Sequence, residues 1–279
     1  MPGVGVGISI PFLNVQQNGN SGGGYDPSAQ LYFDKLIVQP SSSFKNAINN
    51  FVIQLKADGN WLFDRLWIHA TEYRQHARVS LVNPSSTEIT EVNSPGWLAG
   101  KGYFGDGASA YLNSNYKLGT DGINVTNNSL AHYAYIYNTV DAAEASSICG
   151  VYQTGGAGTD TIIQPYYTGG SFFGSANNLG VENSAAIASA RGLSAAVRTD
   201  SMLSKLFRNG SEIASNNFAA ATNGNRDYYM LCFNINGSPT SFSGTNNKLA
   251  ISGLSSGAVD QATFFAAVDA LAIALNFKP

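Results

Sequence analysis

Aromatic side chains at every second position are the groups of this 279-residue chain best placed for binding chemistry. The stretch LAHYAYIYNT puts Tyr133, Tyr135 and Tyr137 on one face of a predicted strand, because strand side chains alternate between the two faces of a sheet. A row of tyrosine rings on an exposed sheet would form a groove on which sugar rings stack. The alternative is that both faces are covered, one by the opposite sheet and the other by helices or a neighbouring subunit.

A second aromatic cluster lies in QPYYTGGSFFG, which we predict to be a glycine-rich loop. Its rings would either recognise a ligand or fill a contact between subunits. Together the two stretches give the candidate glycan-binding residues Tyr133, Tyr135, Tyr137, Tyr166, Tyr167 and Phe172, with Phe173 beside them.

No residue pattern in the chain predicts catalysis. Retaining glycoside hydrolysis needs two carboxylates about 5 Å apart, and the chain has no Glu-x-Asp-x-x-Glu strand to supply them. The three histidines form neither a zinc motif nor a nucleophile elbow. The closest acidic pairs fall in predicted loops and are expected to be solvated: Glu88 with Glu91, and Asp141 with Glu144. We therefore predict a protein that is not an enzyme and has no catalytic residue.

Two Asp-Gly steps, at Asp106 and Asp121, are the candidates for a calcium site. Calcium takes oxygen ligands from aspartates and backbone carbonyls, but Asp-Gly more often marks a turn. The turn is the favoured interpretation, so we predict no metal and no other cofactor.

Composition narrows the function classes further. Charged residues make up 12% of the chain, about half of the usual quarter, and the formal net charge is −3. The 15 basic residues are scattered, which argues against binding to nucleic acid. The only cysteines, Cys149 and Cys232, each lie in an apolar run and are predicted to be buried free thiols, not a disulfide.

The first 13 residues, MPGVGVGISIPFL, alternate aliphatic side chains with glycine and serine. No Lys or Arg precedes Lys35, which is unlike a secretory signal, and the apolar run is shorter than the about 20 residues that span a membrane. The alternation predicts a strand that docks onto another subunit by strand addition, or alternatively completes a sheet of its own chain. The predicted anchor residues are Val4, Val6, Ile8, Ile10 and Phe12.

The rest of the chain divides into a linker, a helical segment and a β-rich body. Residues 14–25 form the Gly/Asn-rich linker, and residues 26–59 are predicted to hold two helices, one beginning at Asp26-Pro27 and one capped by Ser43. Ile37 is expected on the buried stripe of the first helix. Residues 60–279 contain many short apolar stretches, among them HARVSLV, and end in a helix capped by Ser255 or Ser256. This pattern predicts a jelly-roll-like sandwich, with Asn209-Gly210 as a hairpin turn.

From Tyr25 onward the chain resembles a group of tailed-phage virion structural proteins with a concanavalin A-like (laminin G/lectin-type) sandwich. The motifs that carry the resemblance, in order, are YDPSAQLYFDKL, AINNFVIQLKADGNWLFDRLWI, VNPSSTE, GDGASAYLNSNYKL, VRTDSMLSKLFRNGSEIA and ISGLSSGAVDQATFFAAVDALAIAL. The chain departs from the family pattern after the Trp strand, where IHATEY replaces the usual Tyr-Pro pair.

The resemblance implies a mainly β, concanavalin A-like jelly-roll sandwich with two N-terminal helices and one C-terminal helix. It implies a structural component of a virion (tail, fibre or capsid-decorating protein) assembled in the host cytoplasm. Such a protein would be attached to other virion proteins through its N-terminal peptide and would be a trimer by analogy, without membrane or nucleic-acid partners. The alternative function is an adhesin that binds host-surface polysaccharide, and a polysaccharide depolymerase comes third.

Overall fold

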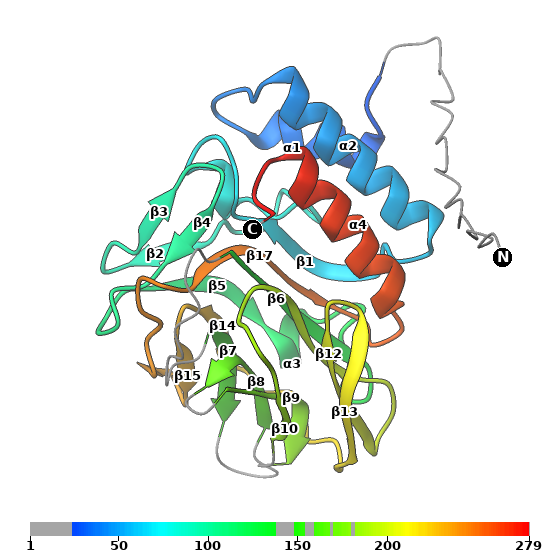
Figure 1. The fold of residues 1–279 in the computed structure, drawn as a ribbon, viewed down its shortest axis with the longest axis vertical. Helices are drawn as coiled ribbons and strands as arrows, with labels where there is room; N and C mark the ends of the chain where they lie inside the picture. The colour runs from blue at the N-terminus through cyan, green and yellow to red at the C-terminus, as the bar shows by residue number, and fades with distance from the viewer. Residues whose placement is uncertain (1–23, 138–147, 154–158, 168–169, 180–181, 279) are drawn as a thin grey trace, which may run out of the picture.

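The protein is a β-sandwich of two sheets with a layer of helices on one side (Figure 1). The computed structural model describes residues 24–137, 148–153, 159–167, 170–179 and 182–278. The predicted fold class is confirmed: the described chain is mainly β, with two long helices before the strands and one after them. The predicted anchor, residues 1–13, and nearly all of the linker lie outside the described residues.

One sheet has eight strands. They run β13-β12-β11-β6-β17-β4-β3, and β1 pairs with β17 off this path. The strands are β1 (Phe63–Ile68), β3 (Gly96–Leu98), β4 (Gly102–Phe104), β6 (Leu130–Tyr137), β11 (Gly192–Arg198), β12 (Leu203–Arg208), β13 (Ser211–Asn217) and β17 (Lys248–Ser255).

The other sheet has nine strands. They run β10-β9-β8-β7-β14-β5-β2, with β15 pairing with β7 and β16 with β15. The strands are β2 (Thr90–Val92), β5 (Tyr111–Lys117), β7 (Cys149–Gln153), β8 (Thr159–Tyr167), β9 (Ser171–Leu179), β10 (Asn183–Ala186), β14 (Asp227–Met230), β15 (Phe233–Ile235) and β16 (Ser238–Thr240).

Each long helix begins at a side-chain cap. Asp26 accepts the Ser28 N–H at 2.8 Å at the start of α1 (Pro27–Lys35), as the Asp-Pro pair predicted. Two predicted caps were wrong. Ser41 caps α2 (Ser42–Ala57) in place of Ser43, and Asp260 caps α4 (Gln261–Ala274) in place of Ser255 or Ser256. The short helices are α3 (Leu118–Asp121) and the 3₁₀ turn η1 (His76–Arg78).

Two further local predictions were wrong. HARVSLV is not a strand: it forms η1 and then joins Trp67 of β1 through a single bridge at Ser80. Ile37 is 81% exposed. Since α1 ends at Lys35, Ile37 lies beyond the helix and not on its buried stripe.

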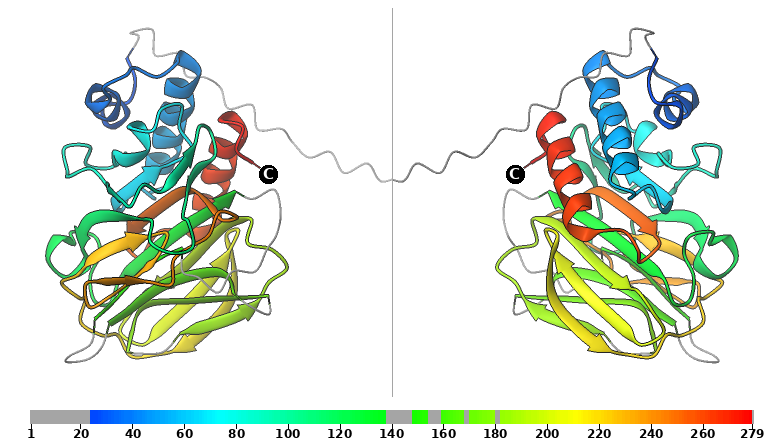
Figure 2. Two further views of the ribbon diagram at one scale, coloured as in Figure 1. Left: turned by 90° about the vertical axis from the view of Figure 1, so that its left-hand side faces the viewer. Right: turned by 90° about the vertical axis from the view of Figure 1, so that its right-hand side faces the viewer.

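Two apolar cores lie one on each side of the eight-stranded sheet. The helix core joins α1, α2 and α4 to the outer face of that sheet, and the inter-sheet core fills the space between the two sheets. Figure 2 shows the long helices together at one end of the molecule, away from the nine-stranded sheet. Among the described residues, no helix is both long and apolar enough to cross a lipid bilayer.

Local sequence signals explain two other features. Asn209 and Gly210 both adopt positive φ, which is the backbone of the type I′ turn that joins β12 to β13. Cys149 and Cys232 are buried free thiols, which confirms that prediction.

Candidate functional site

The predicted tyrosine groove on β6 does not exist, because helices cover it. Tyr133 and Tyr135 are at most 2% exposed and belong to the helix core. The Tyr133 ring lies 4.7 Å from that of Phe264 on α4, and the Tyr135 ring lies 5.5 Å from that of Phe277. The alternative interpretation holds for this strand: helices cover one face and the nine-stranded sheet covers the other.

Tyr137, at the end of the same strand, is half-buried. Lys101 places its amine 4.2 Å from the centre of the Tyr137 ring. This cation–π contact and the packing of Tyr137 against the helix core, which also buries Tyr135, give its ring a structural environment.

The predicted aromatic loop is the β8–β9 hairpin. Most of QPYYTGGSFFG is therefore strand, which alternates its rings between the two faces of the sheet. Phe172 is fully buried in the inter-sheet core, and Tyr166 packs against that core, so neither is available to a ligand. Tyr167 and Phe173 point to the opposite, outer face, where their half-buried rings meet edge to face at 5.2 Å.

Five more rings share this outer face of the nine-stranded sheet with Tyr167 and Phe173. Sequence neighbours of these rings, such as Tyr228 beside Tyr229 and Val151 beside Tyr152, point inward to the inter-sheet core. By strand alternation the rings carried on strands point outward, and Phe242, just after β16, contacts Tyr111 on the same side. None of them belongs to either core cluster, although Tyr229 (7% exposed) and Phe233 (9%) are buried beneath their neighbours. We call this set the aromatic row: Tyr111, Tyr152, Tyr167, Phe173, Tyr229, Phe233 and Phe242.

The aromatic row consists of three groups of touching rings. Tyr111 lies 4.7 Å from Tyr229 and 6.3 Å from Phe242, measured between ring centres. Tyr152 lies 6.4 Å from Phe233, and the third group is the Tyr167–Phe173 pair. The groups are carried on strands from β5 to β9, four strand spacings or about 19 Å across the sheet.

Each group has a polar side chain as a direct cross-strand partner. Asn113 is opposite Tyr229, Gln164 is opposite Phe173, and Asp160 is opposite Tyr152. Directly opposed side chains lie on the same face of a sheet. Flat apolar rings therefore alternate with amide or carboxylate groups across this surface.

Asp160 stands in an unusual environment on this face. Its side chain is 6% exposed, and Oδ1 has no hydrogen-bond partner. Burial, and then the nearby Glu182 carboxylate, raises the pKa of Asp160 to about 7. Burial also raises the pKa of Glu182. When ionised, above about pH 7 for Asp160, these two carboxylates would disfavour a negatively charged ligand at this end of the aromatic row.

The remaining acidic residues have local partners. Asp106 accepts the backbone N–H groups of Ala108, Ser109 and Ala110, and these bonds hold its pKa well below the usual value. Asp121 accepts the Lys117 N–H. Both aspartates thus have the local hydrogen bonds of turn residues. In the described part of the chain, no group of three His, Cys, Asp or Glu side chains could hold a metal ion.

Within the described residues, both members of the Glu88/Glu91 pair lie against arginine side chains. Glu91 forms an ion pair with Arg74 at 2.6 Å, and Glu88 lies 3.6 Å from Arg78. Asp141 and Glu144 lie outside the described residues, as do all five predicted anchor residues.

Sequence reasoning found Tyr167 and Phe173 but missed the other five members of the aromatic row. They are spread over several elements between β5 and the segment after β16, and no local motif marks them. The alternation of side chains along a strand was the signal that could have found them. In YYMLCFNI, for example, it places Tyr228 and Tyr229 on opposite faces of a strand.

Sequence comparisons find no relative: no family model matches the chain, and no curated protein matches it. Among solved structures, its fold is similar to that of a mutant Trypanosoma rangeli sialidase displaying trans-sialidase activity. The TM-score is 0.53 and the identity 10%, over 81% of this chain and 39% of that one. The chain thus spans about two fifths of the sialidase's length.

A weaker likeness links the chain to domain 4 of AbnA, a GH43 extracellular arabinanase from Geobacillus stearothermophilus, in complex with arabinotriose. The TM-score is 0.46 and the identity 12%, over 73% of this chain and 98% of that one. At these identities the comparison with the sialidase establishes the sandwich fold, and the function has to be argued from the chain's own surface.

Proposed function

We propose that this protein is a non-catalytic carbohydrate-binding sandwich that holds a neutral oligosaccharide on the aromatic row. The observation that carries the proposal is the set of half-buried outward rings Tyr152, Tyr167 and Phe173, with the amide of Gln164 directly opposite Phe173 on the neighbouring strand. Binding sites for small polar ligands combine apolar rings with a few placed polar groups. Sugars suit such a surface because their C–H faces stack on rings while their hydroxyls need hydrogen-bond partners.

The dimensions and charge of the surface define the ligand. Three ring groups spread over about 19 Å fit an extended oligosaccharide better than a single sugar ring. Asp160 and Glu182 would repel a sugar carboxylate, so a neutral glycan is expected to bind better than a sialylated one. Because Asp160 is 6% exposed, we assign it an electrostatic role and not that of a catalytic acid.

Truncation of the half-buried Tyr167–Phe173 ring pair tests this function. We expect full-length protein to bind cellohexaose or another neutral oligosaccharide on a glycan array more strongly than sialyllactose. Tyr167→Ala and Phe173→Ala should each weaken the binding measured by calorimetry about five- to tenfold, because each removes a stacking ring. Tyr73→Ala is the matched control, since Tyr73 is 45% exposed and lies outside the row.

Two results would contradict the proposal. One is the absence of binding to every neutral and acidic glycan on the array. The other is binding that Tyr73→Ala weakens as much as Phe173→Ala. Attachment to a virion through residues 4–12 is compatible with glycan binding, and it stays a prediction from the sequence because those residues lie outside the described structure.

A further inference from the structure

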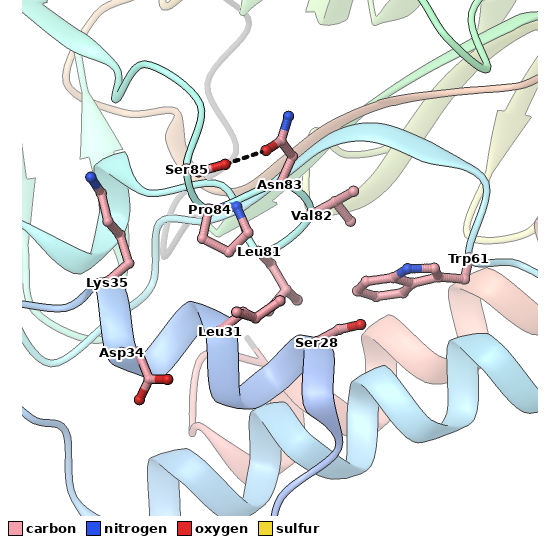
Figure 3. A pocket seen from close by; sticks show the side chains of 10 residues that line it. All are labelled: Ser28, Leu31, Asp34, Lys35, Trp61, Leu81, Val82, Asn83, Pro84 and Ser85. Atoms are coloured by element: carbon pink, nitrogen blue, oxygen red, sulfur yellow. Dashed lines mark hydrogen bonds between the residues drawn. The ribbon is translucent and has the colours of Figure 1, made fainter.

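A pocket of about 410 Å³ lies at the helical end of the molecule, far from the aromatic row (Figure 3). It is formed between α1 and the segment 81–85, with Trp61 at one side. Its volume falls within the about 300–1,000 Å³ of ligand-binding clefts. Leu31, Leu81 and Val82 line the middle of the pocket, and Leu31 remains 62% exposed although it is a large apolar side chain.

The interior of the pocket is apolar. Figure 3 shows the Lys35 amine and the Asn83 amide pointing away from Leu31, Leu81 and Val82. The Asn83 carbonyl oxygen accepts a hydrogen bond from the Ser85 hydroxyl at 2.9 Å. The lining also includes the polar residues Ser28, Asp34, Lys35, Asn83 and Ser85, but aliphatic side chains would fill the apolar middle without needing a hydrogen-bond partner.

Contacts within the protein fix the position of the Trp61 ring at one side of the pocket. The amine of Lys56, on α2, lies 5.3 Å from the centre of a Trp61 ring and forms an ion pair with Asp26 at 2.6 Å. Asp26 is also the cap of α1. Lys56 of α2 therefore contacts both the N-terminal cap of α1 and the indole of Trp61.

The chain itself contains a segment that matches the pocket. Residues 1–23 carry no charged side chain, and residues 4–12 place aliphatic or aromatic side chains at every second position. The described chain starts at Gly24, four residues before Ser28, which lines the pocket. A generic Gly-rich chain as long as residues 14–23 has a root-mean-square span of about 17 Å, a length that would let residues 4–12 reach the pocket.

We propose that the pocket between α1 and residues 81–85 binds residues 4–12 of the same chain. The short linker favours the same chain over a second copy, because it keeps the segment at an effective concentration in the millimolar range. The alternating pattern lets one face of the segment enter the pocket while the glycine and serine face stays outside. This inference does not depend on the proposed glycan binding.

Disulfide trapping in the full-length protein tests the proposal. Gly5→Cys, Gly7→Cys and Ser9→Cys place a thiol on the small-residue face and leave the aliphatic side chains intact. Each is combined with Ser85→Cys at the exposed rim of the pocket and oxidised at micromolar protein concentration. We expect at least one pair to form a disulfide within the monomer on a non-reducing gel, at least fivefold faster than with Ser238→Cys, an exposed position on β16.

Two aspartate substitutions, one inside the pocket and one outside it, test whether disulfide formation depends on the pocket. Leu31→Asp should slow the cross-link at least fivefold because it puts a charge in the pocket, while Ile37→Asp should not, since Ile37 is 81% exposed and does not line it. Three outcomes would overturn the proposal: no cross-link with any of the three cysteines, equal rates in the two aspartate variants, or disulfide-linked dimers, which would identify a second copy as the occupant.

Discussion

Asp160 is the residue at which the stability of the fold conflicts with the proposed selection of neutral glycans. Its carboxylate is buried on the face that carries the aromatic row, with one oxygen unpaired. An isosteric amide would avoid the cost of burying a charge there. Within the proposed function, we assign this carboxyl group to the choice between neutral and acidic glycans.

Asp160→Asn should therefore stabilise the protein in a pH-dependent way. The folded pKa of about 7 lies above the unfolded value of 3.8, so the stability that protonated Asp160 contributes is present below pH 3.8 and is lost as the pH rises through 7. The variant should gain at most about 4 kcal/mol over wild type in urea unfolding at pH 8 and almost nothing at pH 4.

Asp58→Asn, at an exposed carboxylate, is the control and should change the stability by less than about 0.5 kcal/mol at either pH. If Asp160→Asn destabilised the protein at pH 8, the carboxylate would have an essential structural partner, and its assignment as an electrostatic filter would be wrong.

At the scale of elements, the pairing of β6 with α4 decides which tyrosines are available to a ligand. The centre of the Phe264 ring lies 5.1 Å from that of Phe63 and 4.7 Å from that of Tyr133. Helix α4 therefore covers the face of β6 that the sequence suggested as a groove. Truncation of Tyr133 or Tyr135 would open a cavity under the helix and would say nothing about glycan binding.

Phe264→Ala tests how firmly α4 is docked. Loss of a fully buried phenyl ring should lower the free energy of unfolding by about 3–5 kcal/mol, measured by urea denaturation. Ile273→Ala on the same helix should cost less than about 0.5 kcal/mol, since Ile273 is 60% exposed. Equal effects of the two variants would mean that α4 does not form the core described above.

The sequence predicts local elements better than it predicts which layers cover them. Asp26-Pro27 and Asn209-Gly210 mark a helix start and a hairpin turn because capping and positive φ are local requirements. The start of α4 was misplaced because several Ser and Asp residues before it can all cap. Alternation shows that Tyr133 and Tyr135 share a face, but only long-range packing with Phe264 and Phe277 shows that the face is buried.

The candidate site was harder to predict for the same reason. Tyr167 and Phe173 were named because they are close in sequence, although their hairpin was mistaken for a loop. Tyr111 and Tyr229 meet only because β5 pairs with β14, more than a hundred residues later. No pattern in either strand by itself indicates that contact.

At the scale of the whole molecule, the two outer faces of the sandwich have different roles. The long helices lie on the eight-stranded sheet (Figure 1) and bury its outer face. The nine-stranded sheet carries the aromatic row on its own outer face. The described chain starts next to α1, at the opposite end from β9 and β10. A segment docked in the pocket beside α1, as proposed above, would therefore leave the aromatic row accessible to glycans.

Aromatic NMR of the full-length protein, titrated with the oligosaccharide that binds best on the array, tests the central claim most directly. We predict that ring resonances of Tyr152, Tyr167 and Phe173 shift together with one dissociation constant, while those of Tyr73 stay fixed. Saturable shifts confined to rings outside the aromatic row, or no shifts in any ring at millimolar oligosaccharide, would contradict glycan binding on this face.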